Sequence, residues 1–138
     1  MWNILLCMVA MPSAAQTIYD VTTAGAVGDG KTDDTKVIQR VIDRCSEEGG
    51  GRVLLPRNHV FMAGPLELKS NVELYLEASA TLKANPDESI YHLSAFGKNR
   101  GDGMLWLYAR GADNLAITGR GTIHGNGIAF MGAELSDS

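Results

Sequence analysis

The chain has 138 residues, a length that suits one small domain. Its formal net charge of −4 argues against a nucleic-acid binder, because such proteins carry a basic patch. Hydrophobic residues make up 45% and charged residues 20% of the sequence, as in folded proteins rather than disordered ones. No apolar run reaches the ~20 residues of a membrane span. The composition therefore predicts a folded domain that binds neither nucleic acid nor membrane.

The first 15 residues are predicted to be a signal peptide. They hold no charged side chain, and residues 2–11 form an apolar run of the length of a signal-peptide core. Small residues at 13–15 then offer a cleavage site, which predicts a secreted or periplasmic protein; a buried N-terminal helix is the alternative. Cleavage would remove Cys7 and leave Cys45 without a disulfide partner. We expect Cys45 to be buried.

Residues 16–138 are predicted to contain one helix and otherwise only strands. A short strand at 18–21 is followed by a glycine-rich loop at 22–31. The helix is expected to begin near Thr32, capped by Thr32 or Asp33, and to end at the three glycines of 49–51. Its apolar residues share one face at helical spacing: Val37, Ile38, Val41, Ile42 and Cys45.

After the helix, the hydrophobic period changes from 3.6 to 2, which indicates strands. The strands are expected at 52–56, 59–63, 71–77, 80–84, 104–109, 114–118 and 121–124. Polar residues without a period occupy 86–103, and they predict a long surface loop.

A weak internal repeat suggests how these strands are arranged. Residues 71–74 resemble 114–117, and residues 80–83 resemble 121–124. The first pair of segments lies 43 positions apart, which predicts two solenoid turns of about 21 to 22 residues each. Because such a stack must cover its hydrophobic end, the helix is expected to act as a cap. The pattern favours an all-β solenoid, a parallel β-helix of about three coils, over an antiparallel sandwich.

Residues 25–32 match the phosphate-binding loop pattern G-x-x-x-x-G-K-[ST]. We reject a nucleotide site, because the preceding strand carries Asp20 where a buried parallel strand is apolar. Asp33 and Asp34 would also meet the phosphates with negative charge at the start of the helix. No apolar strand ending in Asp follows to hold magnesium.

The other polar and aromatic groups predict no cofactor and no metal site. Asp29, Asp33 and Asp34 lack calcium-loop spacing, and we expect them to cap the helix and shape the loop. The histidines are too scattered for a metal centre: His59, His92 and His124. Four aromatic residues suit sugar stacking, with core or surface packing as the more ordinary role: Tyr75, Tyr91, Trp106 and Tyr108. Lys98 and Arg100 suit an anionic ligand or a solvated loop.

Two stretches, 19–35 and 49–56, resemble the N-terminal signature of the pectin-lyase-like right-handed β-helix superfamily. That signature occurs in polygalacturonases, phage tailspikes and some glucanases, so it indicates fold rather than function. Three further stretches, at 64–72, 74–82 and 114–127, are similar to glycoside hydrolase family 28, of which polygalacturonases are members. The last stretch departs from the family by carrying His124 where Asp is usual.

The resemblance implies a right-handed β-helix that hydrolyses pectin-type polysaccharides with inversion and is monomeric at full length. Inversion requires an acid and a base carboxyl ~6.5–9.5 Å apart. The family's Asn-Thr-Asp, Asp-Asp, Gly-His-Gly and Arg-Ile-Lys motifs are expected beyond Ser138. Asp33-Asp34 and His124-Gly125 only imitate two of these motifs, so no catalytic residue is assigned.

Residues 16–138 are therefore predicted to be the cap and first coils of a truncated domain, inactive by itself. The substrate fits galacturonan or rhamnogalacturonan. Two alternatives stay open: a non-catalytic glycan-binding or tailspike-like β-helix, and a related polysaccharide lyase. A binding protein would need a groove but no acid pair.

Overall fold

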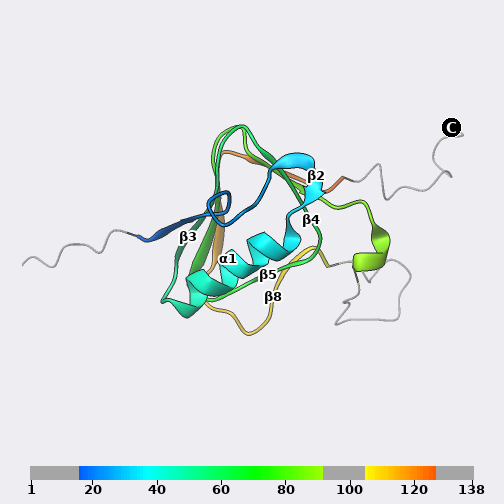
Figure 1. Ribbon diagram of the computed structural model, residues 1–138. Helices are drawn as coiled ribbons and strands as arrows, with labels where there is room; N and C mark the ends of the chain where they lie inside the picture. Colours follow the sequence, from blue (N-terminus) through cyan, green and yellow to red (C-terminus); the bar gives the residue numbers. More distant parts are fainter. Residues whose placement is uncertain (1–15, 92–104, 127–138) are drawn as a thin grey trace, which may run out of the picture.

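The computed structural model describes residues 16–91 and 105–126 of the chain (Figure 1). Its short strands wind through successive coils and pair only in parallel. Sheet A contains β1 (Ile18–Asp20), β3 (Gly51–Leu55), β6 (Val72–Leu76) and β9 (Ala116–Gly119). Sheet B contains β2 (Asp29–Asp33), β4 (Val60–Ala63), β7 (Thr81–Ala84) and β10 (Thr122–His124). Sheet C contains β5 (Leu66–Leu68) and β8 (Leu107–Ala109). The parallel solenoid predicted from the sequence is confirmed.

The coil length differs from the prediction. Arg52 and Glu73, which face each other in adjacent coils, lie 21 residues apart. Asn71 and Asn114 also belong to adjacent coils, because their side chains are hydrogen-bonded although they lie 43 residues apart. The 43-residue repeat is therefore one coil rather than two. The additional chain lies between β7 and β8 and includes the 3-10 helix Glu88–Ile90.

Inward-facing side chains stack from coil to coil to form the core. In sheet A, Val53 lies beside Leu74, and in sheet B, Phe61 lies beside Leu82; all four are fully buried. Along each strand, the positions that alternate with the buried ones face outward and are at least partly exposed, as β6 and β7 show. Strand β5 was not predicted from the sequence.

Helix α1 (Thr35–Glu47) adds an apolar stripe to the same core. The predicted stripe is confirmed, with Ile38, Val41, Ile42 and Cys45 buried and Val37 partly buried. Burial raises the pKa of the Cys45 thiol, as expected for a packing residue. The predicted start near Thr32 is wrong, because Thr32 and Asp33 belong to strand β2.

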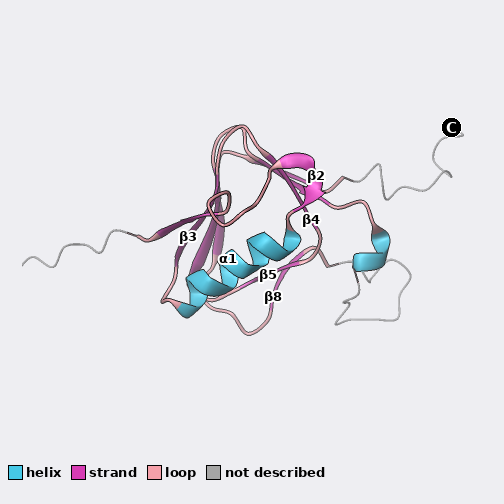
Figure 2. Cartoon of the chain, in the orientation of Figure 1, coloured by secondary structure: helices cyan, strands magenta, loops and turns pink. Residues whose placement is uncertain are grey.

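Helix α1 lies beside β5 (Figure 2), and its polar side chains bond the backbone there. The Gln39 amide accepts from the Glu67 N–H at 2.8 Å and donates to the Glu67 carbonyl at 3.0 Å. The amide thus bonds β5 as a neighbouring strand would. Thr35 Oγ1 accepts from the Gly64 N–H at 2.7 Å, and Ser46 Oγ donates to the Ser70 carbonyl at 2.9 Å. These bonds suit a cap, which stays a prediction.

The last coil leaves its inward positions uncovered. Ile117 pairs with the buried Leu74, and Ile123 pairs with the buried Leu82, yet the two isoleucines are 38% and 44% exposed. Strands β9 and β10 also end the order of their sheets among the described residues. This end therefore presents apolar side chains beside unpaired strand edges, a combination that promotes association.

We expect the double substitution Ile117→Thr and Ile123→Thr to reduce self-association of the 138-residue chain, because it removes apolar surface while keeping β-branched residues. Sedimentation velocity over a series of protein concentrations measures the effect. The matched control is Val27→Thr, at a loop residue that is 50% exposed. Equal self-association of the three proteins would contradict this interpretation of the end.

Candidate functional site

The glycine-rich stretch 25–32 forms no nucleotide site in the structure. Its last four residues, 29–32, belong to strand β2, so Lys31 and Thr32 lie in a strand rather than at the start of the helix. Asp34, which is only 1% exposed, accepts hydrogen bonds from the Val27 and Gly28 N–H groups, each at 2.9 Å. Because a carboxylate already occupies these loop donors, the rejection of phosphate binding agrees with the geometry.

The three aspartates of this region face different partners. Asp29 accepts from the Lys31 and Thr32 N–H groups at 2.9 and 2.7 Å, and these bonds lower its pKa. Asp33 accepts from the Thr35 N–H at 2.8 Å and from the Thr35 hydroxyl, while Asn85 Nδ2 donates to its other oxygen at 2.8 Å. Their predicted loop-shaping role is confirmed.

The predicted capping role is only partly correct. Asp33 bonds the first residue of α1, whereas Asp34 occupies the N-cap position without a capping bond from its side chain. Its carboxylate turns back to the loop instead. Within 16–91 and 105–126, no three histidine, cysteine or acidic side chains are grouped to hold a metal ion.

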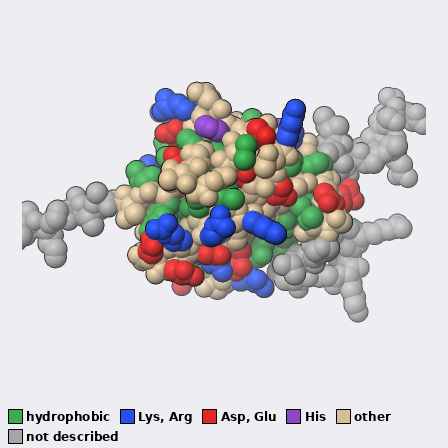
Figure 3. Space-filling view, in the orientation of Figure 1, with side chains coloured by type: hydrophobic (Ala, Val, Ile, Leu, Met, Phe, Trp, Pro, Cys, Tyr) green, Lys and Arg blue, Asp and Glu red, His purple; other side chains and the backbone are tan. Residues whose placement is uncertain are grey.

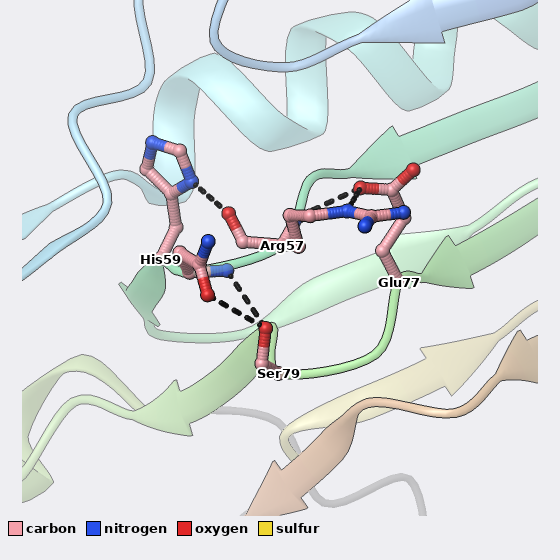
Figure 4. Close-up of polar contacts among 5 residues, drawn as sticks. Arg57, His59, Glu77 and Ser79 are labelled. Atoms are coloured by element: carbon pink, nitrogen blue, oxygen red, sulfur yellow. Dashed lines mark hydrogen bonds and ion pairs between the residues drawn. The ribbon is translucent and has the colours of Figure 1, made fainter.

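A polar cluster joins two coils at the corner between sheets A and B (Figure 4). The Arg57 N–H and Nε donate to Glu77 Oε2 at 2.9 and 3.3 Å, and the main-chain bond is the largest cause of the lowered Glu77 pKa. Asn58 N–H donates to Ser79 Oγ at 3.1 Å, and Ser79 Oγ donates to Asn58 Oδ1 at 2.9 Å. His59 Nδ1 lies 2.7 Å from the Arg57 carbonyl. The cluster stabilises two stacked turns.

The two histidines within the described ranges occupy different parts of the fold. His59 belongs to this corner and stacks on Phe61, with 5.4 Å between ring centroids. His124 lies in β10, and its Nδ1 accepts from the Asn126 N–H at 3.0 Å. His92, Lys98 and Arg100 lie outside the described residues.

The aromatic candidates for sugar stacking have packing partners. Tyr91 is buried and donates to the Asn85 carbonyl at 2.7 Å, and Trp106 Nε1 donates to the Ala63 carbonyl at 3.0 Å. Arg52 lies 4.1 Å from the centre of the Tyr75 ring, and Arg110 lies 5.6 Å from that of Tyr108. Core and surface packing is the role that these contacts support.

On sheets A and C, outward-facing cations are matched by carboxylates. Arg52 Nη2 lies 3.0 Å from Glu73 Oε1, and Thr118 Oγ1 also donates to that oxygen at 2.6 Å. Beside sheet C, Arg110 and Lys69, which directly follow β8 and β5, lie 3.3 and 3.5 Å from Glu67 Oε2. Basic and acidic side chains are likewise interspersed on the molecular face of Figure 3.

On the outer face of sheet B, the side chains of β7 and β10 lack, among the described residues, the ion pairs seen on sheets A and C. Its outward residues in β7 and β10 are Thr81, Lys83, Thr122 and His124, and they pair across the strands as Thr81 with Thr122 and Lys83 with His124. None of the four belongs to an ion pair within the described ranges. Sequence reasoning did not select this patch, although the internal repeat already aligns residues 80–83 with 121–124.

Comparisons with known proteins agree with this architecture. Residues 18–130 match the family model described as rhamnogalacturonase A/epimerase, pectate lyase-like. The chain belongs to this family. An exopolygalacturonase from Zea mays is 33% identical over 114 residues, which cover 80% of this chain and 25% of the relative.

Solved structures show the same relationship. The hyperthermoactive exopolygalacturonase of Thermotoga maritima aligns with a TM-score of 0.70 and 35% identity, covering 83% of this chain and 26% of that one. The family 28 exopolygalacturonase of Yersinia enterocolitica aligns with a TM-score of 0.70 and 32% identity, covering 83% and 22%. The resemblance to family 28 and the right-handed β-helix are thereby confirmed. The chain spans about a quarter of the curated relative's length.

We expect Asp34→Ala to destabilise the fold by about 3 kcal/mol, because it leaves two loop N–H groups without their buried acceptor. Thermal and urea unfolding followed by circular dichroism measure the change. Asp29→Ala is the matched control: it also removes a carboxylate that accepts two N–H bonds, but from an exposed side chain. Because water can replace that acceptor, we expect a loss below about 1 kcal/mol. Equal losses would contradict the role given to Asp34.

We expect acid to weaken the fold partly through Glu73. The Thr118 hydroxyl, followed by Arg52 and Gln16, lowers its pKa below the ordinary 4.5. Its contribution to the free energy of unfolding is therefore complete above the ordinary pKa and is lost as pH falls through the lower, folded value. Glu73→Gln should reduce stability at pH 7 and flatten its decline below about pH 4.5. Urea unfolding from pH 7 to pH 3 tests this.

The control for this experiment is Glu47→Gln, which removes the same charge from an exposed side chain on α1. It should leave the pH dependence close to that of the unsubstituted chain. If Glu73→Gln and Glu47→Gln gave the same profile, the hydrogen bonds to Glu73 would not be the source of the acid sensitivity.

Proposed function

We propose that residues 16–138 are the first coils of a secreted hydrolase that cleaves galacturonan-type glycosidic bonds with inversion. The similarity to exopolygalacturonases carries this proposal, since it extends over about four-fifths of the chain in both sequence and structure. Residues 1–15 would direct export as a signal peptide and would then be removed. Among the described residues, the structure contains no candidate membrane-spanning helix.

The carboxyl groups of the described coils do not suit the acid step of such a reaction. A general acid needs a raised pKa in order to protonate the leaving oxygen. The carboxyl pKa values that are shifted in the described residues are shifted downward: Asp29, Glu48, Glu67, Glu73, Glu77 and Asp87. Asp33 and Asp34, which imitate the family's acid pair, are held by loop and helix donors. We therefore place the general acid outside the described residues, and we place the base there too, because the family's motifs are expected beyond Ser138.

The uncovered end of the stack supports this assignment. Ile117 and Ile123 continue the inward rows of sheets A and B, and the strand edges beside them suit another parallel coil. Further coils would bury these isoleucines and extend each sheet face in the same direction. In this proposal the described coils contribute a substrate-facing surface, and later coils contribute the chemistry.

The test is an activity assay with polygalacturonate. We expect the purified 138-residue chain to release no reducing ends. We expect a longer protein, whose reading frame continues through the four family motifs, to release them. Ultraviolet absorbance measured in parallel identifies a lyase, because lyases form unsaturated products. Hydrolysis by the chain alone would refute the assignment of the carboxyls, and unsaturated products from the longer protein would refute hydrolysis.

A further inference from the structure

We propose that Lys83 and His124 together bind a carboxylate on the outer face of sheet B, and that the ligand is a uronate unit of an acidic polysaccharide. This inference rests on the proposed function and names a contact with its substrate. The argument depends on the register of β7 and β10, on the charges of the three sheet faces, and on the hydrogen bonding of the imidazole.

The two side chains are direct neighbours across adjacent strands. Lys83 pairs with His124, and the preceding pair, Leu82 with Ile123, faces the core. Side chains alternate along a strand, so Lys83 and His124 both face outward. Paired positions in neighbouring strands lie about 4.8 Å apart, which allows one carboxylate to accept from both groups.

No carboxylate of the described residues neutralises this pair. On the other side of Lys83 lies Met62, and beyond Met62 lies Asp33. The Asp33 carboxylate is bonded to Thr35 and Asn85. In contrast, Arg52 of sheet A lies across from Glu73, which supplies its counter-charge. Lys83 therefore offers its ammonium group to an external anion.

His124 is oriented as a second donor. Its Nδ1 accepts from the Asn126 N–H at 3.0 Å, so the neutral imidazole carries its hydrogen on Nε2. We infer this tautomer from the acceptor role of Nδ1. An Nε2–H beside an ammonium group provides two donors for a carboxylate without requiring a second positive charge.

The neighbouring outward pair suits a sugar rather than a bare anion. Thr81 and Thr122 face each other two residues before Lys83 and His124 on the same side of the sheet. Two residues span about 6.6 Å along a strand, a length comparable to one sugar ring. A uronate unit presents hydroxyl groups and a carboxylate over that length, whereas a neutral sugar would leave Lys83 unpaired.

The test compares trigalacturonate with its methyl ester as ligands for the 138-residue chain, by isothermal titration calorimetry in low salt. The variants are Lys83→Gln and His124→Asp, and the second places a carboxylate across from Lys83 as Glu73 lies across from Arg52. Arg40→Gln is the control, because it removes an exposed cation from α1. Circular dichroism checks that each protein is folded.

We expect trigalacturonate to bind about fivefold more weakly to Lys83→Gln, and more weakly still to His124→Asp, because each exposed ionic contact contributes up to about 1 kcal/mol. The methyl ester should bind weakly and equally to all four proteins. Arg40→Gln should bind trigalacturonate as the unsubstituted chain does.

Two results would overturn the inference. One is equal binding of acid and ester with no effect of either substitution; the other is no binding of trigalacturonate by the folded chain. Neither result bears on hydrolysis, which the reducing-end assay decides separately. If the longer protein released no reducing ends while the expected binding pattern was observed, the proposed function would be refuted and the binding inference would stand.

Discussion

The fold depends on the parallel register between coils. Each inward side chain must lie on the same inward position of the next coil, as Val53, Leu74 and Ile117 do in sheet A. A core built in this way grows in one direction, and each coil is stabilised mainly by its two neighbours. The ends of the stack therefore need other groups to cover their apolar side chains and to bond their unpaired strand edges. Beside β5, Gln39 of helix α1 bonds the Glu67 backbone as a neighbouring strand would, whereas Ile117 and Ile123 lack a covering coil among the described residues.

Sharp corners between the sheets are the second requirement of this register. Asn71 and Asn114 precede β6 and β9 with φ of 64° and 58°, a left-handed conformation that asparagine tolerates, and their side chains bond each other at 3.1 Å. At Gly119, φ is 104°, and a Cβ atom would lie only 2.0 Å from the Leu76 carbonyl oxygen. These residues fix where each strand begins or ends, and so they keep the outward positions of adjacent coils aligned.

The sequence predicted the solenoid because its inward residues alternate and its turns recur. It misjudged the coil length because chain inserted between β7 and β8 doubles the spacing between Asn71 and Asn114 without adding a coil. It also placed the start of the helix too early. Strand β2 has no apolar residue that would mark it as a strand, and the bonds from Val27 and Gly28 to Asp34 reach back six and seven residues, beyond a capping pattern. Lys83 and His124 were visible as a repeat, but their lack of a counter-charge depends on cross-strand pairing that residue patterns do not show.

The same register links the proposed binding contact to the proposed chemistry. Adjacent coils place equivalent side chains about 4.8 Å apart, and alternate coils place them about 9.6 Å apart. An inverting hydrolase needs its two carboxyls ~6.5–9.5 Å apart, a separation that side chains on one sheet face reach within one or two coils. If later coils continue sheet B, carboxyls on its outer face would lie in line with Lys83 and His124. A sugar chain held by these two residues would then run along the coil axis toward the reacting groups.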